Sequence, residues 1–124
     1  MNPEFVKCYT AGGAMGPNLI AKWGAADFAV ILAVGVTVPL IGVTRGLITS
    51  ATGDPVDIVM QGIYPIKAGG TITRGDPITS NGSGQAVTAA PSAGTNNYII
   101  GYANISAVSG DLVDVIIEPQ VLQG

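Results

Sequence analysis

The sequence predicts a single all-β domain, in the form of a small compact barrel or sandwich. From residue 28 onward, short apolar runs are broken by turn signals at intervals of about 8–12 residues, which is the strand spacing of all-β folds. The 18 glycines and 8 prolines interrupt the chain too often for long helices. A length of 124 residues fits one domain with one modest core.

The first and strongest apolar run, residues 28–43, predicts two buried strands that meet near Val38-Pro39. Its β-branched residues suit a pleated sheet better than a helix. A membrane-spanning helix needs about 20 apolar residues, and this run is shorter and contains Gly35 and Gly42, so we expect no membrane segment. Residues 80–84 predict a hairpin, because Asn and Gly accept the positive φ of tight turns. The predicted strands are residues 29–34, 40–44, 56–61, 78–79, 85–89, 99–104 and 112–118.

Two parts of the chain are similar to each other. Residues 41–44 and 53–59 read like residues 100–103 and 110–116: an apolar strand with a glycine, a small-residue loop, a Gly-Asp turn and a second strand. A third Gly-Asp turn, at Gly75-Asp76, opens another strand. This repetition predicts a pseudo-repeated barrel or sandwich whose alternate residues face one core.

The N-terminal residues 1–27 differ from the rest and are treated as a separate arm, with residues 28–124 as a single β domain. A flexible stretch at residues 11–18 breaks any regular element, and large apolar residues lie on both sides of it. Such a segment is typical of an arm that orders against a neighbouring molecule. The alternative, which the sequence leaves open, is an edge strand folded back on the domain's own core.

Charged residues make up only 10% of the chain, and the net charge is -3 with a pI of about 4.4. Binding to nucleic acid requires clustered Lys and Arg, so we expect no nucleic-acid partner. The few charges leave an exterior of small polar and apolar residues, and exposed apolar area of this kind marks an interface. We therefore expect a protein that assembles with a partner. The N-terminus carries no export signal, which predicts synthesis in the host cytoplasm.

Residues for catalysis are scarce, and we expect no enzyme activity, cofactor or metal. Histidine is absent, and the lone Cys8 has no base to activate it. The aspartates in or just after the turns are interpreted as bonding their own backbone. A calcium site built from Asp54, Asp57, Asp111 and Asp114 is a weak alternative. The integrin-type tripeptide Arg74-Gly75-Asp76 is interpreted as part of a turn.

The order of motifs between residues 39 and 119 resembles that of a known family. The chain reads PLIGVTRG, then GDPVDIVMQGIYPIKAGGTITRGDPITSNGSGQAV, then IIGYANISAVSGDLVDVIIEP. This ordered set is similar to the capsid cement, or head decoration, proteins of tailed bacteriophages. The resemblance covers about two thirds of the chain, and residues 1–27 match it less well.

The resemblance implies a β-tulip or β-clip fold with an extended N-terminal arm that reaches over coat subunits. It also implies a virion protein on the capsid exterior, a homotrimer bound to the major capsid protein at three-fold and quasi-three-fold positions. Its function there would be to staple coat subunits and stabilise the expanded shell. The residues that we expect to contact the capsid are Phe5, Val6, Tyr9 and Trp23, although Trp23 could instead cap the barrel. The alternative function is a carbohydrate- or receptor-binding β module of a virion or surface fibre.

Overall fold

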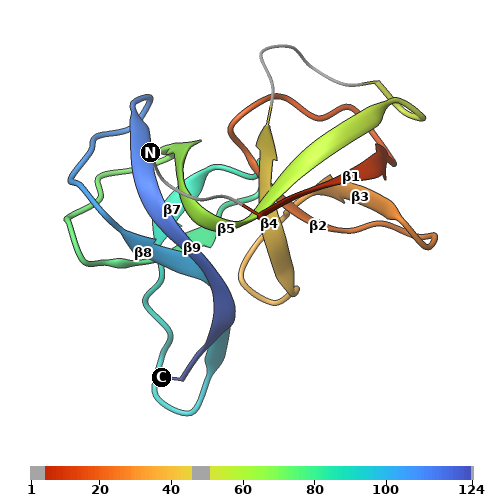
Figure 1. Cartoon of the computed structure of the whole chain (residues 1–124). Coiled ribbons are helices and arrows are strands. Elements are labelled where there is room, and N and C mark those ends of the chain that lie inside the picture. The colour runs from red at the N-terminus through yellow and green to blue at the C-terminus, as the bar shows by residue number, and fades with distance from the viewer. Residues whose placement is uncertain (1–4, 46–50, 124) are drawn as a thin grey trace.

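The computed structural model describes residues 5–45 and 51–123, and these residues form an all-β structure (Figure 1). Nine strands occur in the described ranges: β1 (Phe5–Ala11), β2 (Ile20–Trp23), β3 (Ala29–Leu32), β4 (Leu40–Arg45), β5 (Pro55–Lys67), β6 (Pro77–Ser80), β7 (Ala86–Thr88), β8 (Asn96–Ala103) and β9 (Leu112–Gln123). The predicted all-β class is confirmed. No helix in these ranges is long and apolar enough to cross a membrane.

The first lobe is a small closed barrel. β1 pairs in parallel with β3, and antiparallel pairs then join β3 to β2, β2 to β4 and β4 to β5. The first half of β5 also pairs with β1, which closes the ring. Closure gives these five strands hydrogen-bonded neighbours on both sides, so the lobe needs no long free edge.

The second lobe is an open sheet in the order β5, β9, β8, β6, β7. β5 belongs to both lobes, and Figure 1 shows it crossing from the barrel to the second sheet. The change occurs at Gly62, which has a φ of 111° and is the first β5 residue to pair with β9. Glycine is the residue that adopts this conformation without strain, so Gly62 lets one strand leave the barrel and join the second sheet.

All seven predicted strands are present, and two further strands, β1 and β2, lie in the segment that was treated as an arm. The structure decides between the two interpretations of that segment. Its described residues do not extend from the domain, because β1 and β2 complete the barrel. The physical reason is burial: Tyr9, Ala11, Met15 and Ile20 are each at most 6% exposed. The flexible stretch between β1 and β2 is a connection within the barrel.

Two apolar clusters hold the lobes together. The smaller fills the barrel and includes Met15, Val30 and Ile58. The larger lies between the barrel and the second sheet, with members from both such as Ile20, Val59 and Ile117. β5 contributes to both clusters through neighbouring residues, because successive side chains of a strand point to opposite faces. Strand β5 therefore connects the two apolar cores and joins the two lobes.

The predicted Gly-Asp turns are three copies of one structure. Gly53, Gly75 and Gly110 have φ values of 91°, 92° and 93°. In each turn the following Asp donates its N–H to the carbonyl three residues earlier, at 3.0, 3.0 and 3.1 Å. The carboxylate of Asp54 also accepts the N–H of Ala51 at 2.9 Å, as the sequence predicted for turn aspartates.

The predicted hairpin at residues 80–84 joins β6 to β7. The side-chain oxygen of Asn81 accepts the N–H groups of Ser83 at 2.9 Å and Gln85 at 3.0 Å. The carbonyl of Gly84 then accepts the N–H of Ile20 at 2.7 Å, so this hairpin is also bonded to β2 of the barrel. The turn chemistry thus positions the hairpin and docks it on the other lobe.

Candidate functional site

The four residues predicted to contact a partner occupy three different environments on the barrel. Tyr9 is 6% exposed and belongs to the barrel core, whereas Trp23 at the end of β2 is 47% exposed. Phe5 is 55% exposed at the start of β1, and Val6 is half-buried against the larger cluster. A register shift between Phe5 and Val6 separates their environments. Only Tyr9 and Trp23 lie together.

Tyr9 and Trp23 form the wall of a groove at one end of the barrel, which we call the aromatic groove. Their ring centroids are 5.6 Å apart with an interplanar angle of 78°, an edge-to-face contact that fixes the exposed indole against a buried ring. The Tyr9 hydroxyl donates to the sulfur of Met60 at 3.5 Å. The groove has a volume of about 430 Å³ and is lined by Lys7, Tyr9, Trp23, Gly24, Ala25, Ala26, Asp27 and Phe28.

Two strands and one turn build the aromatic groove. β1 supplies Lys7 and Tyr9, β2 supplies Trp23, and the connection between β2 and β3 supplies residues 24–28. The parallel pairing of Thr10 with Ala29 places that connection beside β1. The Lys7 Nζ lies 5.5 Å from the Tyr9 ring centroid and 5.7 Å from that of Phe28, within cation–π range of both.

Lys7 and Phe28 are the functional candidates that the sequence analysis missed. Both depend on the parallel β1–β3 pair, which joins segments that no local pattern connects. Phe28 was interpreted as the start of a buried apolar run, yet it is 66% exposed. Strand alternation gave no signal for this exposure, because it would place Phe28 on the same face as the buried Val30, and the left-handed φ of Phe28 ends the strand geometry at that residue.

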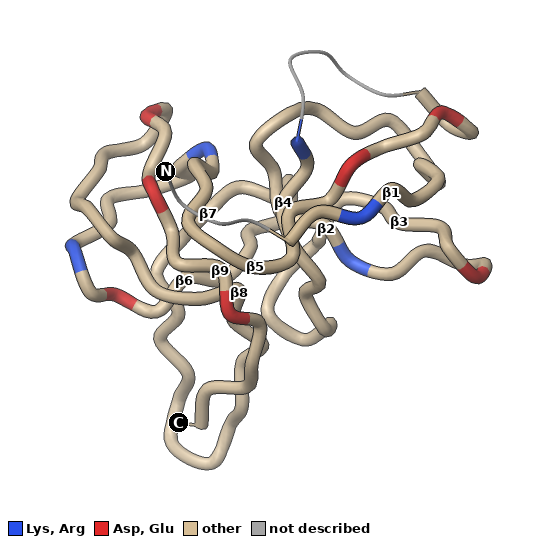
Figure 2. The backbone as a smooth tube through the Cα atoms, viewed as in Figure 1, with Lys and Arg blue, Asp and Glu red and all other residues tan. Residues whose placement is uncertain are grey.

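The rest of the described surface is sparsely charged, as Figure 2 shows along the backbone. Exposed apolar area was predicted, but from small residues such as alanine and valine; in the described ranges large apolar side chains are exposed as well. The three aromatic ones are all in the barrel lobe and in the first 28 residues. The exposed large hydrophobic residues are Phe5, Trp23, Phe28, Val34, Ile105, Val108, Leu112, Ile116 and Val121.

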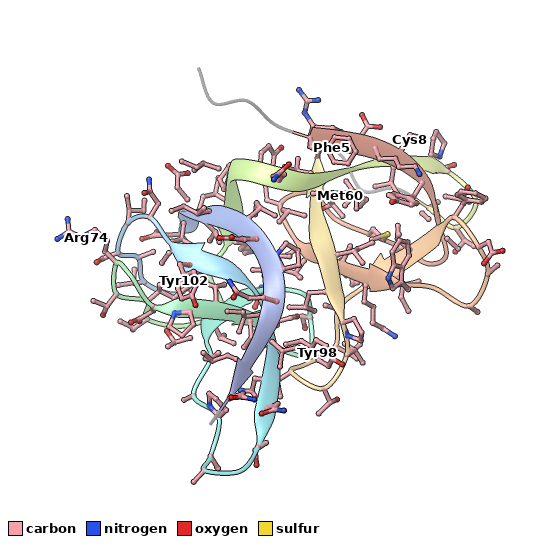
Figure 3. All side chains as sticks on the ribbon, turned by 60° about the horizontal axis from the view of Figure 1, so that its bottom comes forward. Phe5, Cys8, Met60, Arg74, Tyr98 and Tyr102 are labelled. Carbon is pink, nitrogen blue, oxygen red and sulfur yellow. The ribbon has the colours of Figure 1, made fainter. Side chains whose placement is uncertain are left out.

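The alternative sites proposed from the sequence do not form in the described ranges. Asp54, Asp57, Asp111 and Asp114 gather into no group of three potential metal ligands. The Asp76 carboxylate accepts hydrogen bonds from the Thr73 N–H at 2.9 Å and the Thr88 hydroxyl at 3.0 Å, so it is bonded within its own turn and to β7. Arg74, the first residue of the integrin-type tripeptide, lies at the opposite end of the molecule from the exposed Cys8 (Figure 3).

Comparisons with known proteins agree with this architecture. Residues 20–117 match the family model for phage cement protein. The crystal structure of the head fiber gp8.5 N base of bacteriophage phi29 has a TM-score of 0.64, 21% sequence identity and coverage of 95% of each chain, a likeness of fold. No curated protein matches the sequence. Because the family match spans well over half of the residues, the chain belongs to the phage cement protein family, and it is a capsid-associated structural protein of the virion.

Proposed function

We propose that this protein binds the outer surface of an icosahedral phage head as a homotrimer, at three-fold and quasi-three-fold positions. There it staples neighbouring subunits of the major capsid protein and stabilises the expanded shell. The observation that carries this proposal is the match of residues 20–117 to the cement family. The exposed apolar side chains support it, because a soluble monomer keeps such patches small.

The proposed contact surface is the barrel end that bears Trp23, together with Phe5 at the start of β1. Both side chains are about half exposed and lie on strands, so little conformational entropy is lost when a partner covers them. Val6 and Tyr9 are more buried than Trp23 and Phe5. In this proposal they pack beneath the contact surface and do not themselves contact the partner. A closed barrel is a rigid base for such a contact.

Avidity is the proposed source of tight binding. Apolar contact contributes about 25 cal/mol per Å² before ordering costs, so one contact by a few side chains is weak. Three copies around one axis make the second and third contacts effectively intramolecular. Only the expanded shell would present three sites at the required separation, which would restrict binding to mature heads. The role is mechanical, with no catalytic step.

The test is quantitative mass spectrometry of purified, DNA-filled particles, comparing this chain with the major capsid protein. A copy number close to stoichiometric with the coat would support the cement function. A handful of copies per particle would contradict it and favour the receptor- or carbohydrate-binding alternative. Heads from a mutant phage that lacks this chain should release DNA at a lower temperature, and the purified protein should restore them.

Truncation of residues 1–27 is a poor probe of the contact, because it removes β1 and β2 and opens the barrel. Trp23→Ala is a cleaner variant, since it shortens a half-exposed side chain and leaves the strand pairing intact. Val34→Ala, at 56% exposure in another loop, is the matched control. We expect Trp23→Ala to weaken binding to heads and Val34→Ala to bind like the wild type.

A further inference from the structure

We propose that Phe28 is the anchor residue of the contact with the shell, and that Lys7 selects a carboxylate beside an apolar patch on the coat surface. This inference rests on the proposed docking to the phage head. It assigns the aromatic groove to one occupant, a coat segment that combines an apolar side chain with an Asp or Glu.

Phe28 has a φ of 63°, which lies in the left-handed region that a bulky residue rarely adopts. The surrounding turn enforces this conformation. The Phe28 carbonyl accepts the N–H of Thr10 at 2.8 Å, and the Ala29 N–H donates to the Ala26 carbonyl at 3.2 Å. Glycine or asparagine would occupy this position with less strain. Strained residues of this kind cluster at binding sites, where the rest of the fold maintains them.

The side chain of Phe28 belongs to neither apolar core cluster, so core packing does not explain the strain. This side chain is 66% exposed, the highest value among the exposed large hydrophobic residues of the described ranges. The other left-handed positions of the described ranges hold glycine, as in Gly53 and Gly75, or asparagine at Asn18, which are the residues that tolerate this conformation. Phe28 and the half-exposed Trp23 line the same groove, and a cluster of exposed aromatic side chains is typical of an interface hot spot.

Lys7 gives the groove its charge preference. Its ammonium group lies over the rings of Tyr9 and Phe28 at 5.5 and 5.7 Å, so the cation is positioned next to the apolar anchor. An apolar partner that covers Phe28 would remove water from this cation, and a carboxylate on the partner would compensate for the lost hydration. Asp27 also lines the groove, and its negative charge would repel a partner carboxylate placed next to it. The partner's carboxylate is therefore favoured next to Lys7 and disfavoured next to Asp27.

The experiment measures binding of purified variants to DNA-filled heads from a phage mutant that lacks this chain. We expect Phe28→Gly to weaken binding about 30-fold, the effect of removing a hot spot. Its urea midpoint should be equal to or higher than that of the wild type, because glycine relieves the strained φ. Phe28→Asn, which also accepts this φ, should repeat both results, and Phe28→Tyr should bind within about threefold of the wild type.

Lys7→Glu should weaken binding by about tenfold or more, and Lys7→Gln should make binding less sensitive to salt than in the wild type. Leu112→Ala is the matched control, because Leu112 is 54% exposed on β9 in the other lobe. It should bind within about twofold of the wild type.

Three outcomes would overturn the inference while leaving the proposed function intact. They are wild-type binding by Phe28→Gly and Phe28→Asn, unchanged salt dependence in Lys7→Gln, and a loss in Leu112→Ala as large as that in Phe28→Gly. Failure of the wild-type protein itself to bind the heads would instead contradict the proposed function. The two failures are therefore distinguishable in the same binding series.

Discussion

Gly101 on β8 lies directly against the main-chain carbonyl of Ile116 on β9, so that any Cβ at position 101 would overlap this oxygen. Gly42 on β4 has the same relation to the carbonyl of Val59 on β5. Both pairs occupy equivalent positions in the two similar stretches of the sequence, residues 41–59 and 100–116. The repetition in the sequence therefore corresponds to a repeated close approach between two paired antiparallel strands, which a missing side chain makes possible.

Gly101→Ala should destabilise the protein by about 3 kcal/mol or more, because the new methyl group would force β8 away from β9. Urea unfolding at equilibrium measures this change. Gly82→Ala is the control: no atom lies within 4 Å of a Cβ at Gly82, and we expect a change within about 0.5 kcal/mol. Equal stability of the Gly101 and Gly82 variants would contradict the close approach.

Asn18 should be sensitive to substitution because it covers the free edge of β5 next to the barrel. Its side-chain NH₂ donates to the Pro65 carbonyl at 3.0 Å, its own carbonyl accepts the Lys67 N–H at 2.9 Å, and its φ is 60°. Asn18→Ala loses both the side-chain hydrogen bond to Pro65 and a residue that tolerates the left-handed conformation. We expect it to lower the free energy of unfolding by about 2 kcal/mol. Asn18→Gly keeps the conformation and should cost about 1 kcal/mol by the same unfolding measurement.

The comparison of these two variants separates backbone strain from the side-chain hydrogen bond. If Asn18→Gly were as destabilised as Asn18→Ala, the left-handed conformation would contribute nothing. If both matched the wild type, Asn18 would not hold the edge of β5.

Thr44 is 1% exposed, and its hydroxyl connects β4 to the loop before β2. It donates to the Gly16 carbonyl at 2.7 Å and accepts the Leu19 N–H at 3.0 Å. Thr44→Val should cost about 1–3 kcal/mol, because the Gly16 carbonyl and the Leu19 N–H, both partly buried, lose their partner. Thr44→Ser retains the hydroxyl and should cost about 1 kcal/mol for the lost methyl group. Calorimetry of both variants measures these changes. A valine variant more stable than the serine variant would contradict the stabilising role of the Thr44 hydroxyl.

Asp76→Ala should destabilise the second lobe by about 1–2 kcal/mol, because its carboxylate accepts hydrogen bonds from Thr73 and from Thr88 on β7. Asp111→Ala, at the third Gly-Asp turn, removes a carboxylate for which the described residues supply no such bond, and should change stability by about 0.5 kcal/mol at most. Hydrogen exchange of the Thr73 amide is the local measurement. Unchanged protection in Asp76→Ala would show that the carboxylate does not hold the turn.

Local chemistry made much of the fold predictable. The Gly-Asp turns and the residue 80–84 hairpin depend on conformations that a few adjacent residues favour, and they occur where the sequence placed them. Strands such as β4 and β9 were found from apolar patterns over four or more residues. β1 and β2 were not among the predicted strands, and an edge strand in their segment was only an alternative to an arm, because their stability depends on distant partners in β5 and β4.

The candidate site was less predictable than the fold. Tyr9 and Trp23 were selected for their size, and the structure brings their rings together. Phe5 and Val6 were selected for the same reason, and they lie outside the aromatic groove. The size of a side chain does not show which face of a strand it occupies, because the face depends on the register of a strand that was not recognised.

The sequence alone determined the all-β class, the turn positions, the repeated Gly-Asp units and the resemblance to the cement family, because each depends on short-range residue chemistry. Tertiary structure decided that the first 27 residues help to form a barrel, that β5 serves two lobes, and that Lys7 and Phe28 meet beside Trp23. These outcomes follow from barrel closure through the parallel β1–β3 pair and the β1–β5 pair, which join residues far apart in the chain. Long-range pairing is selected by burial of the whole core, and no local pattern encodes it.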